Sequence, residues 1–200
     1  MSDKFGDGRD PYFWSGSDVL RNRLNIHAAQ DLQHAERELT SLRAATLELG
    51  PVQRGLPHLC AIHRQLFQDL YEWAGELREV DIYQGETRFA HFEYLEKEGN
   101  ALMQALEDED YLVGLEPDAF VARLAHYYCE INVLHPFRTG TGRAQRVFFE
   151  QLALHAGYSL DWRDVDVDEW RAANQAGAMG DLAPLEKIFA RVVSEARESE

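Results

Sequence analysis

The sequence predicts a mainly α-helical protein with one small β-hairpin. Most of the chain repeats apolar side chains every three or four residues with charged residues between them, which is the pattern of amphipathic helices. One short stretch around Gly85–Glu86 instead carries β-branched and aromatic residues on both sides of a turn signal. The length of 200 residues suits one domain, and no linker or internal repeat interrupts it, so residues 1–200 are predicted to form a single domain.

The chain begins with a predicted arm, residues 1–16, which is rich in glycine, aspartate and aromatic side chains and is expected to lie over the domain. Ser17 is expected to cap a short helix, and Gly50–Pro51 to stop the helix that follows it. The predicted helices, in chain order, are residues 18–24, 27–49, 57–71, 93–106, 117–134, 143–155, 168–175 and 182–197. The helix 117–134 is the most apolar and is expected at the centre.

A hairpin is predicted over about residues 78–92, with its turn at Gly85–Glu86. The residues that carry this signal are Val80, Ile82, Tyr83 and Phe89. A lone hairpin is marginal in water, so this one is expected to lean on helices or to receive a partner strand. Its outer edge is predicted to be open to pairing with a strand of another protein.

Composition excludes several classes of function. The formal net charge is −15, which opposes nucleic-acid binding because phosphate backbones attract Lys and Arg. No apolar run is long enough for a membrane span, and the N-terminus lacks the apolar core of a signal peptide. Cys60 and Cys129 stand alone without metal-ligand spacing, so two reduced thiols in a cytoplasmic protein are expected rather than a zinc site.

The stretch 135–146 joins two predicted helices and has the composition of an anion-binding loop. Gly140 and Gly142 permit positive φ angles and a close approach of the backbone to a ligand. The helix that starts near Thr141 directs its free N–H groups back at this loop, and its positive dipole end adds to the attraction of an anion.

Charged side chains extend this prediction to a polyphosphate. Arg143 and Arg146 are three residues apart and project from one side of the helix. His135, at the end of the preceding helix, can take a proton from an attacking hydroxyl. Such a site suits phosphoryl or nucleotidyl transfer. The alternative is a helical protein-binding module, in which the histidine is structural and the arginines are ordinary surface residues.

Residues His135–Arg146 read His-Pro-Phe-Arg-Thr-Gly-Thr-Gly-Arg-Ala-Gln-Arg. They resemble the signature of Fic (filamentation induced by cAMP) proteins, whose pattern is His-Pro-Phe-x-Asp/Glu-Gly-Asn-Gly-Arg-x-x-Arg. Residues 59–78 resemble the upstream segment of the family, and residues 10–22 resemble the start of its stand-alone members. The resemblance therefore covers nearly the whole chain.

The resemblance implies a Fic-type helical bundle with a hairpin, the flap, beside the active-site loop. Most Fic proteins transfer AMP from ATP to a hydroxyl side chain of a target protein and release pyrophosphate. By this resemblance His135 is the general base, and Phe137 anchors the loop in the core. The residues implied to hold the ATP phosphates are Gly140, Thr141, Gly142, Arg143 and Arg146. The flap residues implied to dock the target are Val80, Ile82, Tyr83 and Phe89.

Two positions depart from the family pattern. Thr139 stands where the family has the carboxylate that holds Mg²⁺, and a neutral hydroxyl is a weaker ligand for this hard cation. Thr141 replaces the asparagine, and its branched Cβ is expected to resist a positive φ angle. These departures keep open a second possibility, a catalytically degenerate Fic protein that binds nucleotide or a partner protein without efficient transfer.

The sequence also predicts how the site is regulated. Many Fic proteins carry an inhibitory helix with the pattern Ser/Thr-x-x-x-Glu-Gly/Asn, whose glutamate pairs with the second arginine, here Arg146. Glu98–Gly99 has Tyr94 at the Ser/Thr position, and the tail from Ser194 ends in Glu198–Ser199, which is interpreted as frayed and charged. The resemblance thus favours the toxin branch of a toxin–antitoxin pair, in which a small antitoxin supplies the glutamate helix.

The remaining candidates are interpreted as structural. His58 and His63 are five residues apart, so on a helix they point in different directions and are not expected to share a metal. The tryptophans Trp73, Trp162 and Trp170 are expected to be packing residues. The acidic residues Glu36, Glu38 and Asp69 are expected on solvated helix faces.

Overall fold

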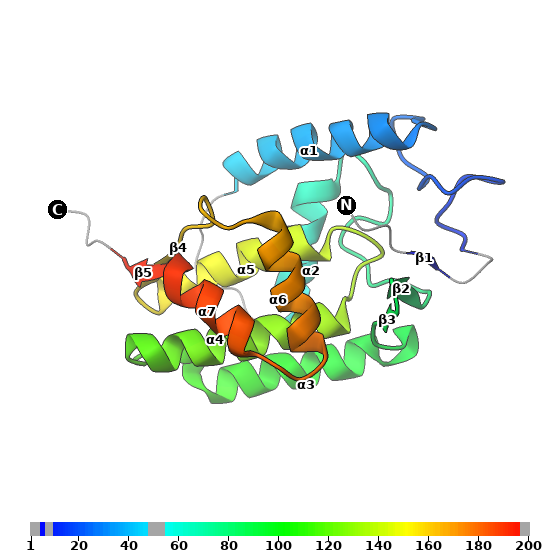
Figure 1. The fold of residues 1–200 in the computed structure, drawn as a ribbon. Coiled ribbons are helices and arrows are strands. Elements are labelled where there is room, and N and C mark those ends of the chain that lie inside the picture. Colours follow the sequence, from blue (N-terminus) through cyan, green and yellow to red (C-terminus); the bar gives the residue numbers. More distant parts are fainter. Residues whose placement is uncertain (1–4, 7–9, 48–54, 197–200) are drawn as a thin grey trace.

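The computed structural model describes residues 5–6, 10–47 and 55–196, and it confirms the mainly helical fold (Figure 1). The α-helices are α1 Ala29–Ala45, α2 Leu56–Phe67, α3 Leu95–Asp108, α4 Pro117–Leu134, α5 Thr141–His155, α6 Val167–Ala178 and α7 Ala183–Val192. Short 3₁₀ turns at Phe92–Tyr94 and Asp110–Leu112 flank α3. The predicted stop at Gly50–Pro51 lies outside the described residues.

Helix α4 lies at the centre of the core, as predicted. It begins with Pro117 at its first turn and packs against α3, α5, α6 and α7. Phe120 and Leu124 are completely buried, and Ile131 nearly so, because apolar residues cover more than one face of this helix. The C-terminal end of α4 runs directly into the loop at His135. In the described part of the chain no helix has both the length and the hydropathy needed to cross a membrane.

The predicted hairpin is present but short: β2 is Ile82–Gln84 and β3 is Thr87–Arg88. One of its two outer edges is covered within the chain. Strand β1, Phe5–Gly6, pairs antiparallel with β2, so β2 is the middle strand of a three-stranded sheet. The arm therefore returns to the hairpin and satisfies the backbone groups of β2. Among the described strands, β3 keeps an open edge.

The predicted helix over residues 18–24 does not form. The Ser17 hydroxyl accepts a hydrogen bond from the Val19 amide, and Phe13 and Leu20 form an isolated β-bridge. The Asn22 amide then bonds to the backbone of Leu20 and Ile26, which gives this segment an alternative to helical hydrogen bonds. The arm continues as ordered, non-helical chain up to α1.

The C-terminal helix is shorter than predicted. Helix α7 ends at Val192, and β5 Val193–Glu195 pairs antiparallel with β4 Tyr158–Leu160, with Ser194 opposite Ser159. The interpretation of the tail as frayed is therefore wrong for residues 194 and 195, because the strand β4 offers them backbone partners. Glu198–Ser199 lies outside the described residues.

Candidate functional site

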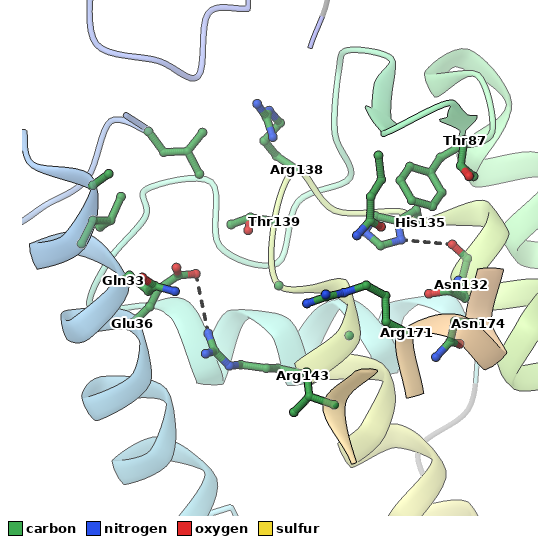
Figure 2. A pocket seen from close by; sticks show the side chains of 18 of the residues that line it. Gln33, Glu36, Thr87, Asn132, His135, Arg138, Thr139, Arg143, Arg171 and Asn174 are labelled. Carbon is green, nitrogen blue, oxygen red and sulfur yellow. Dashed lines mark hydrogen bonds and ion pairs between the residues drawn. The ribbon is translucent and has the colours of Figure 1, made fainter. Parts of the chain in front are cut away.

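A cavity of about 670 Å³ opens between α1, the hairpin, the loop after α4 and the helix α6 (Figure 2). Several separate parts of the chain line it, the N-terminal arm among them. The lining side chains used below are Gln33 and Glu36 from α1, Thr87 and Phe89 from the hairpin, His135 and Thr139 from the loop, Arg143 and Arg146 from α5, and Arg171 and Asn174 from α6. Residues far apart in sequence thus meet around the stretch 135–146.

His135 is held in one tautomer by its surroundings. It ends α4 in the left-handed region, at φ 48°, and its amide still bonds to the Ile131 carbonyl at 2.8 Å. The ring stacks on Phe89 with a centroid separation of 4.0 Å, and Nδ1 lies 3.0 Å from the Asn132 carbonyl oxygen (Figure 2). Because a carbonyl only accepts, Nδ1 carries the proton and Nε2 presents its lone pair.

The two loop glycines differ in conformation. Gly140 is the N-cap of α5 and has φ 82°, and a Cβ atom there would overlap the ring of Phe67. Gly142 lies within the first turn of α5 and has no positive φ angle. It therefore does not use the left-handed conformation that the sequence analysis considered for both glycines. It lines the cavity, and a Cβ atom there would meet nothing within 4 Å. A side chain at Gly142 would therefore project into the open space of the cavity.

Thr141 does not reach the cavity with its side chain. It is fully buried, and its hydroxyl accepts a hydrogen bond of 3.2 Å from the Phe137 amide. Because Thr141 begins α5, its φ angle is not positive and the predicted conformational conflict does not arise. Phe137 is itself fully buried, as predicted, and stacks on His63 at 4.0 Å. The threonine thus stabilises the loop from inside.

Arg143 and Arg146 both line the cavity from α5, and Arg171 of α6 adds a cation that the sequence analysis did not identify. Glu36 is only 8% exposed, and its carboxylate lies 3.8 Å from Nη1 of Arg143 (Figure 2). The expectation of a solvated face is therefore wrong for Glu36, although Glu38 is exposed as predicted. Burial lowers the pKa of Arg143, and the charge of Glu36 partly opposes that effect.

Arg138 lines the cavity on the side of the N-terminal arm (Figure 2). Its guanidinium forms an ion pair of 2.7 Å with Asp10, and both side chains are almost completely buried. Asp69, the other acidic residue that was expected on a solvated face, forms a partly exposed ion pair of 2.8 Å with Arg43. The ion pair between Arg138 and Asp10 fixes the arm to the loop that carries the candidate site.

Arg78 connects the hairpin to the loop. It is 2% exposed and donates hydrogen bonds to the carbonyls of Val80 at 2.6 Å, Ala90 at 2.5 Å and His135 at 2.8 Å. Burial lowers its pKa to about 10, and the nearby Asp81 opposes this shift. Arg78 ends the segment 59–78 that resembles the family, but the sequence does not show these contacts, because its partners are backbone carbonyls from three separate segments.

The hairpin residues predicted to dock a target occupy different environments. Ile82 is fully buried and Phe89 is 4% exposed, so neither offers its side chain to another protein. Val80 and Tyr83 are half-buried. Ile82 and Phe89 are the buried side chains through which the hairpin packs on the rest of the domain. The sequence analysis expected such packing of a lone hairpin.

Thr139 lines the cavity with a neutral hydroxyl, and its carbonyl accepts a hydrogen bond of 2.8 Å from His63. Among the described residues, no group of three or more histidines, cysteines, aspartates or glutamates could hold a metal ion. His58 hydrogen-bonds with Gln151, so His58 and His63 have different partners. Cys60 and Cys129 are free thiols, and the three tryptophans expected to be packing residues do pack against the core.

The fold and the site together define a helical protein in which a histidine and an arginine-bearing loop face a hairpin across one cavity. Residues 55–153 match the Fic/DOC family. The chain belongs to this family, since it is 70% identical over 200 residues to a probable protein adenylyltransferase Fic of Salmonella typhimurium, with both chains fully covered. It is 68% identical, again over both full chains, to a protein of the same description from Escherichia coli.

Among solved structures, the chain is similar to the BepC protein of Bartonella tribocorum with bound AMPPNP. The TM-score is 0.86 at 25% identity, and the match covers 93% of this chain and 97% of that chain. An N-terminal Fic domain from Bartonella quintana with bound ADP gives a TM-score of 0.84 at 26% identity over 92% of this chain and 94% of that one. The predicted Fic-type helical fold is therefore confirmed.

Proposed function

We propose that this protein is a protein adenylyltransferase, which transfers AMP from ATP to a hydroxyl side chain of a target protein. The observation that carries this proposal is the arrangement of His135, with Nε2 as its accepting nitrogen, in the same cavity as Arg143 and Arg146. The names of the similar bacterial proteins and the nucleotides in the similar structures support the same activity.

In the proposed reaction the target hydroxyl oxygen attacks the α-phosphorus of ATP. Nε2 of His135 accepts the hydroxyl proton as the new P–O bond forms. The bond between the α-phosphorus and the bridging oxygen breaks, and pyrophosphate leaves with the electron pair. Arg143 and Arg146 neutralise the charge that develops on this leaving group, and the N–H groups at the start of α5 receive phosphate oxygens.

The nucleoside is proposed to lie between the hairpin and α6. Asn174 donates to the Trp170 carbonyl at 2.9 Å, while its Oδ1 is buried without a hydrogen-bond partner among the described residues. Buried acceptors are normally satisfied, so this oxygen suits a donor group of the base or ribose. Thr87 of the hairpin lines the same cavity (Figure 2).

The residues at the expected metal position do not fit Mg²⁺ well, because Thr139 offers only a neutral hydroxyl. We propose that the triphosphate and water supply most of the ligands of any Mg²⁺ that accompanies ATP. Slow or absent transfer, as in a degenerate Fic protein, is the second candidate function, and Thr139 is the observation that favours it. Thr139→Glu restores the carboxylate and tests this directly, whereas Thr141 is fully buried and does not line the cavity.

The hairpin is the proposed docking site for the target, through backbone pairing rather than through Ile82. In the described structure the edge of β3 is open, while the arm occupies the edge of β2. Val80 and Tyr83, both half-buried, remain the side chains proposed to contact the target.

A small antitoxin is the proposed second partner, and the protein is proposed to be the toxin of such a pair in the cytoplasm. Among the described residues Glu36 is the one glutamate that lines the cavity, and its ion pair is with Arg143. Glu98 is exposed on α3 and does not line the cavity. Arg146 is therefore proposed to receive its inhibitory glutamate from a separate chain.

The test of the proposed activity compares ATP labelled on the α-phosphorus with ATP labelled on the γ-phosphorus, each with Mg²⁺ and a bacterial lysate. Adenylyl transfer predicts protein labelling from the α label alone and an AMP adduct by mass spectrometry. His135→Ala should abolish the label, whereas His155→Ala, an exposed histidine at the end of α5, should preserve it. Labelling that survives His135→Ala contradicts the mechanism. Labelling gained only with Thr139→Glu supports the degenerate alternative.

A further inference from the structure

Glu36 is the exception among the acidic residues of α1. Asp31 and Glu38 on the same helix are exposed, while Glu36 is 8% exposed and faces the cavity. Its neighbours are Arg143, at 3.8 Å, and Tyr71, which is 1% exposed. Burial and then the negative charge of Glu36 raise the pKa of Tyr71, so this phenol stays neutral beside the carboxylate.

A buried carboxylate is an unexpected component of a phosphate site. Arg143 is the residue on which Glu36 acts, and Figure 2 shows the two side chains reaching toward each other across the cavity wall. A phosphate that binds Arg143 must approach within a few ångströms of this carboxylate, where two negative charges repel strongly because little water screens them.

We infer that Glu36 is an affinity-determining residue of the nucleotide site, which competes with the polyphosphate of ATP for Arg143. This inference rests on the proposed function, since it takes the Arg143 side of the cavity as the phosphate end. Glu36 then discriminates between nucleotides by charge. The β- and γ-phosphates of a ligand approach the Glu36 carboxylate, whereas a nucleoside monophosphate has no phosphate at that position. Glu36 thus weakens binding of ATP and ADP while leaving binding of AMP nearly unchanged.

An opposite role for Glu36 makes the opposite prediction. If the carboxylate instead positions Arg143 for the phosphate, its removal frees the guanidinium and weakens ATP binding. The charge-competition role and the positioning role therefore differ in the sign of one measured quantity, the dissociation constant of ATP.

The experiment measures dissociation constants of ATP and AMP by titration calorimetry for the full chain and three variants. Glu36→Gln removes the charge at constant shape, and Glu36→Met removes it together with the hydrogen-bonding atoms. Glu38→Gln is the matched control, because it makes the same charge change at an exposed position two residues away. We expect both Glu36 variants to bind ATP about tenfold more tightly and AMP within about twofold of the unaltered chain, and Glu38→Gln to change neither.

Agreement between the two Glu36 variants shows that charge, and not packing, sets the affinity. If either folded Glu36 variant binds ATP as the unaltered chain does or more weakly, competition by Glu36 is wrong, while labelling that depends on His135 leaves the proposed activity intact. If ATP binds only after Glu36 is replaced, the inference is supported in its strongest form. If neither the unaltered chain nor any of the variants binds ATP, both the inference and the proposed activity are wrong.

Discussion

At the scale of single residues, Gly140 and Gly142 lack a side chain for different physical reasons. Gly140 combines φ 82° with a position where any Cβ atom overlaps the buried ring of Phe67. Gly142 is helical, and the space beside it is the cavity itself. The first glycine is therefore required by the fold, and the second by the ligand that the cavity is proposed to hold.

Alanine substitutions separate these two requirements. Gly140→Ala should destabilise the protein by at least about 2 kcal/mol, because it adds left-handed strain to an overlap with Phe67. Gly142→Ala should preserve or raise stability by up to about 1 kcal/mol, since alanine favours the helix, yet weaken ATP binding by placing a methyl group in the cavity. Urea denaturation and calorimetric titration with ATP measure both effects. Equal stability losses in the two variants would contradict this assignment.

The sequence could predict the grouping of those candidate residues that lie in one continuous stretch. His135, Phe137 and Arg143 belong to such a stretch, and the structure places them around one loop. Glu36 could not be identified, because helical spacing shows only a charge between apolar positions, and its burial results from a contact with a residue 107 positions away. The predicted contact of the Thr141 side chain with a phosphate is not supported for a related reason. Its hydroxyl accepts a hydrogen bond from the Phe137 amide inside the loop.

At the scale of elements, the hairpin is held by a buried cation rather than by its own strands. Strand β3 has only two residues, which gives little ladder energy. Arg78 compensates by binding carbonyls on both sides of the hairpin and at the end of α4, and Ala90 donates to the Val133 carbonyl at 3.2 Å. Sequence patterning predicted the hairpin from its turn residues. The hydrogen bonds of Arg78 could not be predicted, because they depend on distances that only the folded chain defines.

Arg78→Lys is expected to loosen the hairpin without unfolding the helices. Lysine has three donors on one nitrogen and cannot reach carbonyls that a planar guanidinium bonds simultaneously, so at least one buried carbonyl loses its partner. Hydrogen exchange followed by mass spectrometry should show amides of residues 80–92 exchanging about tenfold faster, with α4 and α5 unchanged. Arg88→Lys, at an exposed ion pair with Asp81, is the control and should leave exchange unaltered. An unchanged hairpin in Arg78→Lys would contradict the bracing role.

The junction of α3 and α4 is predicted to be sensitive to acid. Arg123 donates two hydrogen bonds to the Glu109 carboxylate, at 2.7 and 2.6 Å, and the Tyr127 hydroxyl donates another. These bonds, those from Arg123 first, hold the pKa of Glu109 below its ordinary value of 4.5. A depressed folded-state pKa contributes stability above the ordinary value, and this contribution is lost as the pH falls through the folded-state pKa.

The measurement for this junction is the urea midpoint of unfolding between pH 7 and pH 3. Glu109→Gln should be less stable than the unaltered chain at pH 7, and the difference should shrink as the pH falls below about 4.5. Glu98→Gln, an exposed residue of α3, should track the unaltered chain throughout. A difference for Glu109→Gln that stays constant with pH would show that the carboxylate charge is not the cause.

At the scale of the whole molecule, the first described residues and the loop that carries the candidate site stabilise each other. The arm places β1 on the hairpin and Asp10 on Arg138, and the Tyr12 hydroxyl accepts a hydrogen bond from the Glu79 amide. Three contacts thus join the N-terminal arm to the hairpin and to the loop, the two parts that face each other across the cavity. The sequence indicated an ordered arm, but its partners lie 67 and 128 residues away for Tyr12 and Asp10, and no local pattern encodes such distances.

Asp10→Asn tests how strongly the arm supports the loop. Arg138 has a side chain only 2% exposed and lies 5.0 Å from the ring of Phe13, so loss of the carboxylate leaves a buried charge without compensation. We expect the free energy of unfolding to fall by about 3 kcal/mol, in urea denaturation, whereas Asp164→Asn at an exposed site should change it by less than about 0.5 kcal/mol. ATP affinity of the folded variant should also fall, because Arg138 precedes Thr139 and Gly140 in the loop. If Asp10→Asn matched Asp164→Asn in both measurements, the arm would be a passive cover, and the loop would owe its shape to Phe137 and Thr141 alone.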